Sequence, residues 1–178
     1  MNSIYDIFHF LFVKWKHNTT IYFLTISTIT SVICSLFQIR FEWKMRRTVF
    51  LFLTIEYIVL VFLSTVFTRR ILDTSRAEYS LLWSYRWGYK VYGWNTVLLE
   101  NCINIFMLMP PAILLLLFLR NKHKALYVFI VCFIISSLIE LLQYSMRRGT
   151  LEIDDTIHNM LGVALVIFLY KKHNEKEI

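Results

Sequence analysis

Long runs of apolar residues alternate along the chain with short clusters of lysine and arginine. A membrane hydrocarbon core of about 30 Å needs roughly 20 apolar residues in a helix, whose backbone groups are hydrogen-bonded within the segment. Four runs have that length and a fifth is shorter; they cover residues 20–39, 49–68, 97–119, 125–145 and 156–170. The pattern therefore predicts an all-α fold, a polytopic bundle of about five transmembrane helices, the last of them short for a full span.

The residues before the first long run form a shorter apolar stretch, from Ile7 to Lys16, which contains His9 and Lys14. No small-residue cleavage site follows it, so it lacks the pattern of a secretory signal. We expect an interfacial helix in this N-terminal segment instead.

Composition agrees with a membrane protein, because 57% of the residues are hydrophobic and the mean hydropathy is +0.55. The net charge of +7 does not indicate nucleic-acid binding, since most basic residues stand at the ends of apolar runs. If the C-terminus is cytoplasmic, that side holds ten of the 19 basic residues, concentrated in two short loops and a short tail. Charge density therefore favours a cytoplasmic C-terminus and an external N-terminus.

Polar residues gather near the ends of the last three predicted helices. Glu140, Gln143 and Arg147 have the spacing of one helical face, and Asp155 and Asn159 have it in the next helix. These helix ends lie on one side of the membrane, whatever the orientation. We expect an outward-opening cleft formed by Glu100, Asn101, Asn104, Glu140, Gln143, Arg147, Asp154, Asp155 and Asn159.

Two interpretations of these polar residues remain open. In the structural one they satisfy each other between helices, with Arg147 pairing with Glu140 or Asp155. In the functional one, the adjacent carboxylates Asp154 and Asp155 need a cation, a metal or a protonated partner, which favours cation binding or acid/base chemistry. No metal-ligand signature matches Glu152, Asp154, Asp155 and His158, so we predict no metal and no cofactor.

Glu56 lies in the middle of the second predicted helix, where a charged side chain is costly. We interpret it as protonated and hydrogen-bonded to a neighbouring helix, with a proton relay as the alternative. Pro110 and Pro111 remove two backbone donors from the third helix and predict a kink there.

The connection between the second and third helices is rich in tyrosine and tryptophan, from Tyr79 to Trp94. Amphipathic rings prefer the headgroup layer, so this segment is typical of an interfacial aromatic belt. The alternative is a stacking platform for a sugar or a lipid headgroup.

Two blocks of the sequence resemble VanZ-like membrane proteins. SSLIELLQYSMRRGTLEIDDTIHNMLGVALVIFLYKK contains Glu-x-x-Gln, a basic and acidic turn, then Asp-x-x-x-Asn and a glycine, and ENCINIFMLMPPAILLLL is similar to the family's Asn-rich helix start. The resemblance divides the chain into residues 1–48, an N-terminal interfacial segment with an additional transmembrane helix, and residues 49–178, a VanZ-like transmembrane core. The matching positions are Asn104, Pro110, Glu140, Gln143, Arg147, Asp155, Asn159 and Gly162.

The resemblance implies a multi-pass protein of the bacterial plasma membrane, associated with resistance to glycopeptide antibiotics, teicoplanin in particular. The leading hypothesis is a module that binds an envelope component, a lipid-linked precursor or a glycopeptide. Its ligand-binding residues would be Asn104, Glu140, Gln143, Arg147, Asp154, Asp155 and Asn159.

Two other functions are compatible with the same residues. One is an intramembrane enzyme acting on lipid headgroups or lipid-linked sugars, with Glu140 or Asp155 as general base and Arg147 stabilising phosphate charge. The other is a small proton-coupled transporter that uses Glu56. In each case the expected partners are the lipid bilayer and such a ligand, without nucleic acid.

Overall fold

A computed structural model of the chain describes residues 17–120 and 122–175. Within these residues, five helical stretches are long and apolar enough to cross a membrane. They are Thr19–Phe41, Met45–Phe67, Trp94–Phe118, Lys124–Ser145 and Ile153–His173. The predicted all-α transmembrane bundle is therefore confirmed, whereas the interfacial helix expected around residues 7–16 lies outside the described residues.

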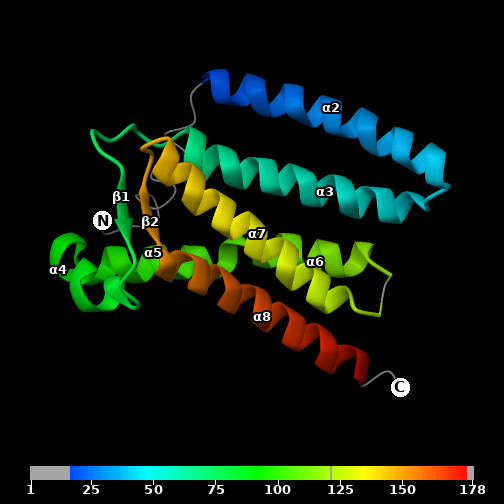
Figure 1. Cartoon of the computed structure of the whole chain (residues 1–178). Coiled ribbons are helices and arrows are strands. Elements are labelled where there is room, and N and C mark those ends of the chain that lie inside the picture. Colours follow the sequence, from blue (N-terminus) through cyan, green and yellow to red (C-terminus); the bar gives the residue numbers. More distant parts are fainter. Residues whose placement is uncertain (1–16, 121, 176–178) are drawn as a thin grey trace.

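The first two spans form a helical hairpin at the edge of the bundle (Figure 1). Helix α2 (His17–Phe41) packs against α3 (Met45–Phe62), and the short turn between them includes Glu42 in the left-handed region, at φ 50°. Helix α3 continues into one π-helical turn, η1 (Leu63–Phe67), so the second span ends later than α3 itself.

The third span consists of two helices, α5 (Trp94–Met107) and α6 (Met109–Phe118), separated at Leu108. Pro110 and Pro111 have no N–H to donate to the carbonyls one turn before them, so one helix cannot continue past this point. Both prolines instead stand in the first turn of α6, where a helix needs no such donors. The predicted kink is thus a complete break in the helix.

The last two spans are α7 (Lys124–Ser145) and α8 (Ile153–Glu175). The prediction that the final helix is short, covering only 156–170, was wrong. Helix α8 begins before the apolar run, with acidic residues in its first turn, and continues beyond it into a basic last turn. Both charge distributions stabilise the helix through its macrodipole, so the helix extends past the residues that hydropathy marks.

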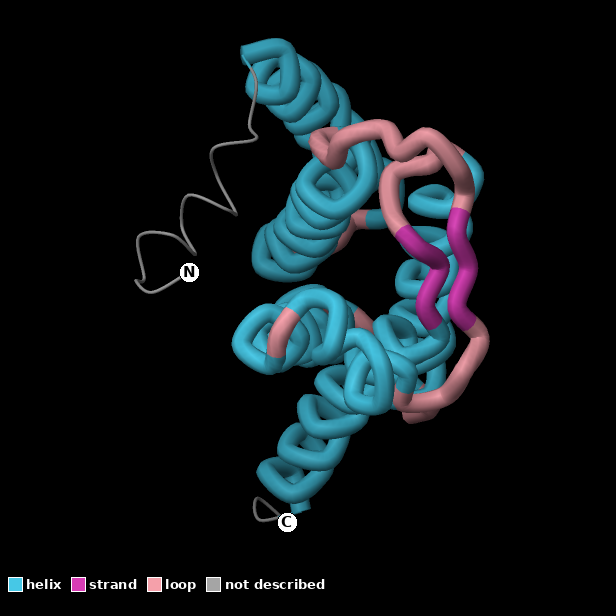
Figure 2. The backbone as a smooth tube through the Cα atoms, turned by 90° about the vertical axis from the view of Figure 1, so that its left-hand side faces the viewer, coloured by secondary structure: helices cyan, strands magenta, loops and turns pink. Residues whose placement is uncertain are grey.

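A small sheet that the sequence analysis did not predict closes one end of the bundle. Strand β1 (Arg76–Glu78) pairs in parallel with β2 (Thr150–Glu152), which leads directly into α8. Figure 2, viewed along the helices from this side, shows the two strands side by side. Between β1 and α5 lie a π-helical turn, η2 (Ser84–Gly88), and α4 (Tyr89–Tyr92).

The bundle therefore has two different ends. At the sheet end, η1 and α7 finish, and α5 and α8 begin. At the opposite end, which we call the turn end, lie the α2–α3 turn, the α6–α7 connection and the end of α8 (Figure 1). Between the ends, side chains from α6, α7 and α8 form the apolar core, which includes Ala112, Leu116, Val128, Cys132, Ile139 and Val163.

Helix α8 approaches α5 very closely at Gly162. A Cβ atom added there would lie 1.8 Å from the carbonyl oxygen of Ile105. Small residues allow membrane helices to bring their backbones together, and no larger residue fits this contact. The close approach also fixes how the first turns of α5 and α8 face each other at the sheet end.

Candidate functional site

Three of the predicted site residues meet at the sheet end from three different spans. Asp155 in α8 accepts a side-chain hydrogen bond from Asn104 in α5. Glu140 in α7 accepts the backbone N–H of Glu152 on its Oε2 atom at 2.9 Å, and it interacts electrostatically with Asp155. The structure thus brings together Asn104, Glu140 and Asp155, which the sequence placed on helices at the same membrane side.

The positive charge among these acids belongs to Arg69, which the sequence analysis did not include in the site. Its guanidinium interacts electrostatically with Glu100, Glu140, Glu152 and Asp155. It also fills the space beside Gly149, where an added Cβ atom would lie 3.1 Å from the Nη1 atom of Arg69. We call Arg69, Glu100, Asn104, Glu140, Glu152 and Asp155 the acidic cluster.

Arg147 does not take the place that the helical spacing predicted. Helix α7 ends at Ser145, and Arg147 adopts a left-handed conformation with φ 54°, so its spacing from Glu140 is no longer helical. Its exposed side chain donates from Nη1 to the carbonyl oxygen of Asp73 at 3.3 Å. The expectation that Arg147 shares a face with Glu140 was therefore wrong, and Arg69 is the arginine of the cluster.

The neighbouring Arg148 positions the segment that carries Arg69. Its Nη1 atom donates to the carbonyl oxygens of Phe67 and Arg69, at 2.5 and 2.8 Å. The turn after α7 therefore holds the backbone after η1 in place.

The carboxylate of Asp154 is hydrogen-bonded to the segment before α4. Its carboxylate accepts the backbone N–H groups of Leu82 and Ser84 and the hydroxyl of Ser84, at 2.7, 3.1 and 2.8 Å, and it is only 2% exposed. These three donors stabilise the carboxylate of Asp154. Asp154 thus anchors the aromatic connection to the start of α8.

The buried amides of the predicted site hold helices together. Gln143 donates to the carbonyl oxygen of Thr65 at 3.2 Å, and Asn159 donates to the hydroxyl of Ser136 at 2.9 Å. Within the described residues, Gln143 Oε1 and Asn159 Oδ1 have no hydrogen-bond partner, and neither does Nδ2 of the buried Asn101. The structural interpretation thus accounts for the amide NH2 groups of Gln143 and Asn159 but not for their carbonyl oxygens.

Glu152 lies outside the membrane-spanning segments, and its surroundings in the acidic cluster shift its pKa. Burial, together with the charges of Asp155, Glu100 and Asp154, raises its pKa to about 8, against the opposing effect of Arg69. Glu152 is therefore mostly protonated at neutral pH and can donate a hydrogen bond as well as accept one. In the part of the chain that the structure describes, no three His, Cys, Asp or Glu side chains are arranged to hold a metal ion.

The cluster reaches the surface beside the aromatic connection. Arg69 and Glu100 are exposed, whereas Glu140 is 5% exposed. On the adjacent face of α8, Tyr85 shares a hydrogen bond of 2.8 Å with His158. The rings of Tyr79 and Trp87 are 67% and 57% exposed, and their role as an interfacial belt or a stacking platform stays a prediction.

Glu56 lies in α3, outside the cluster. It is buried, and both of its carboxylate oxygens lack a hydrogen-bond partner among the described residues. It lies close enough to Cys34 to interact with it electrostatically, which identifies α2 as a helix that it faces. The hydrogen bond expected between Glu56 and a neighbouring helix is therefore not found in residues 17–120 and 122–175.

Comparison with protein families decides the class of this molecule. The sequence profile of the VanZ/LLP1 family matches residues 48–173, which include η1, α5 to α8 and every member of the acidic cluster. The chain belongs to the VanZ/LLP1 family. This VanZ-like protein is a multi-pass membrane protein, and its helix α2 precedes the matched region. Searches of curated proteins and of solved structures returned no significant match.

Proposed function

We propose that the acidic cluster of this VanZ-like protein binds the polar part of an envelope component in the outer leaflet of the bacterial plasma membrane. A lipid-linked saccharide precursor or a glycopeptide such as teicoplanin is the proposed ligand. The protein would act as a binding module, which needs no turnover. A contribution to glycopeptide resistance would follow from that binding.

The observation that carries the proposal is the meeting of four carboxyl groups and one guanidinium where three spans end or begin. Burying charged groups is costly, and among the described residues Arg69 supplies the positive charge that acts on these carboxyl groups. The exposed Arg69 and Glu100 give a ligand access, and the partly buried Asp155 and Glu152 lie behind them.

The chemistry of the cluster suits a ligand with hydroxyl, ammonium and phosphate groups. Ionised carboxylates accept hydrogen bonds from sugar hydroxyls or ammonium groups, and the protonated Glu152 donates one. A guanidinium binds a phosphate or carboxylate through two parallel hydrogen bonds. Arg69 takes the role for an anionic group that the sequence analysis gave to Arg147.

Direct binding tests the proposal with the full chain in lipid nanodiscs. The probes are teicoplanin and a polyprenyl-diphosphate-linked disaccharide, measured by native mass spectrometry or calorimetry. Glu140→Gln, Asp155→Asn and Arg69→Gln should each weaken binding by tenfold or more while the protein remains at normal levels in the membrane. Arg147→Gln is the matched control, because it removes a nearby guanidinium that contacts the Asp73 carbonyl instead. Unchanged binding in the first three variants would reduce the cluster to scaffolding.

An intramembrane enzyme acting on lipid headgroups is the second candidate, and the raised pKa of Glu152 favours it. A carboxyl group protonated near neutral pH beside Asp155 has the arrangement of a general acid and general base. Release of a labelled headgroup from the same precursor by the purified protein would distinguish this function from binding alone. That release should be lost in Glu152→Gln and retained in Arg147→Gln.

A further inference from the structure

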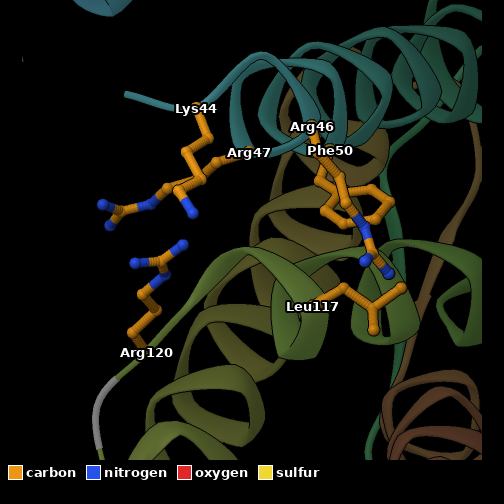
Figure 3. A pocket seen from close by; sticks show the side chains of 6 residues that line it. All are labelled: Lys44, Arg46, Arg47, Phe50, Leu117 and Arg120. Atoms are coloured by element: carbon orange, nitrogen blue, oxygen red, sulfur yellow. The ribbon is translucent and has the colours of Figure 1, made fainter. Parts of the chain in front are cut away.

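A basic pocket of about 350 Å³ lies at the turn end, far from the acidic cluster (Figure 3). It is formed where the start of α3 and the residue before it face the end of α6 and the second residue after it. Its lining residues are Lys44, Arg46, Arg47, Phe50, Leu117 and Arg120. Four of these six residues are basic and none is acidic, although Glu42 stands only two residues before Lys44 in the chain.

Basic side chains from two separate segments of the chain line the same pocket. Figure 3 shows the charged ends of Lys44, Arg47 and Arg120 facing one another, while Arg46 extends along Phe50 toward Leu117. Like charges that share a pocket repel one another, and an anion bound among them would relieve this repulsion. General anchoring by basic residues at helix ends does not require their side chains to meet.

Arg47 is fixed in place by two aromatic rings. Its guanidinium carbon lies 4.5 Å from the ring centre of Trp43 and 4.8 Å from that of Phe118. Its Nε atom is buried and has no hydrogen-bond partner among the described residues. The two ring contacts therefore hold the guanidinium in a defined position in the lining of the pocket.

The start of α3 adds to the positive potential. The residue before the helix, Lys44, makes no capping hydrogen bond with its side chain, and the first turn of α3 contains no acidic residue. The positive end of the helix dipole is therefore not offset by a carboxylate in that turn. A phosphate at this position would be stabilised both by the dipole and by the surrounding side chains.

We propose that this basic pocket binds the phosphate group of an anionic membrane lipid. Arginine side chains bind phosphate in a bidentate manner, and Lys44 contributes a point charge. Phe50 and Leu117 belong to membrane-spanning segments, and Leu117 is 42% exposed, so they provide an apolar wall for the acyl chains beside the headgroup. This wall favours a lipid over free phosphate. On the orientation that charge density predicts, the lipid lies in the cytoplasmic leaflet, which is rich in anionic headgroups.

Native mass spectrometry of the full chain with phosphatidylglycerol tests the proposal. The test variant combines Arg46→Gln with Arg120→Gln, which removes two charges from exposed pocket residues. The control combines Lys171→Gln with Lys172→Gln, which removes two charges from exposed residues at the same end of the bundle but outside the pocket. Lipid affinity should fall at least tenfold in the test variant and less than twofold in the control.

Four results would overturn the proposal. An equal loss of affinity in the two double variants would show that only general charge attracts the lipid. Equal affinity for phosphatidylcholine of the same chain length would show that the headgroup is not recognised. Inorganic phosphate that binds as tightly as phosphatidylglycerol, and displaces it, would assign the pocket to a free anion. Arg47→Lys, which keeps the charge but loses the bidentate geometry, should weaken phosphatidylglycerol binding several-fold, and unchanged binding would also contradict the proposal.

Discussion

Adding a single methyl group at Gly162 should separate α8 from α5 and destabilise the whole bundle. In Gly162→Ala the new Cβ atom would start 1.8 Å from the carbonyl oxygen of Ile105 and 3.1 Å from the Cγ atom of Met109. The first of these contacts is with backbone, which cannot rotate away as a side chain can. To reach an ordinary contact, the helices must move apart by more than about 1 Å.

A gap of this size weakens the packing along the interface. Dispersion contacts lose a quarter to a half of their energy when the atoms separate by about 0.5–1 Å. The core side chains of α8, among them the fully buried Val163, would lose part of their contacts with the rest of the bundle. Overpacking of this kind costs about 2–3 kcal/mol, which corresponds to a fall in unfolding temperature of roughly 5–10 °C for a chain of this size.

Thermal unfolding in detergent measures this loss, with a thiol-reactive dye that labels buried cysteines such as Cys132 as they become accessible. Ala164→Val is the matched control, because it adds volume to an exposed position in the same helix and should change the unfolding temperature by less than 2 °C. If Gly162→Ala unfolds at the temperature of the unsubstituted protein, then α5 and α8 do not pack through this glycine. The site would then lack the fixed spacing between Asn104 and Asp155 that it requires.

Two further substitutions test the buried acids. The pKa of Glu152, about 8 when folded against 4.5 ordinarily, means that the folded chain keeps a proton that the unfolded chain loses, so stability falls as the pH rises from 5 to 8. Glu152→Gln should reduce this fall of the unfolding temperature with pH. The control Glu78→Gln should not, because hydrogen bonds from Ser80 lower the pKa of Glu78 and place its effect below pH 4.5. An unchanged pH dependence in Glu152→Gln would contradict the raised pKa of Glu152. Glu56→Leu should raise the unfolding temperature, because it removes a buried carboxyl group that has no hydrogen-bond partner among the described residues. The free energy of unfolding should rise by about 1–3 kcal/mol. A lower unfolding temperature would instead reveal a stabilising contact of that carboxyl group.

Hydropathy alone was sufficient to predict the spans, because membrane thickness imposes a length that the sequence shows directly. It was less informative about helix ends. Helix α8 begins at Ile153, before the apolar run, because its acidic first turn is favourable for a helix although not for the lipid. A three-residue strand such as β2 is too short to show any alternation of polar and apolar residues.

The site was predictable where the residues stand on helices and unpredictable where they stand in turns. Asn104, Glu140 and Asp155 could be grouped because the ends of successive spans alternate between the two membrane surfaces. Arg147 could not be placed, because helical spacing holds only while the helix continues, and α7 ends two residues before it. Arg69 follows η1 in the chain and joins the cluster only because the turn after α7 holds its backbone, a long-range contact without a sequence signal.

The two proposed sites are independent because of the dimensions of the bundle. The second span runs from the basic pocket at Met45 to the region of the acidic cluster at Phe67, a length of 23 residues. At about 1.5 Å per residue this helix separates the two sites by roughly 35 Å, so one headgroup cannot contact both. A lipid in the basic pocket and an envelope ligand at the acidic cluster would therefore be separate molecules in opposite leaflets. Substitution of Arg46 and Arg120 should leave ligand binding at the cluster intact, and Glu140→Gln should leave lipid binding at the pocket intact. Loss of both activities in either variant would mean that the substitution disturbs the fold.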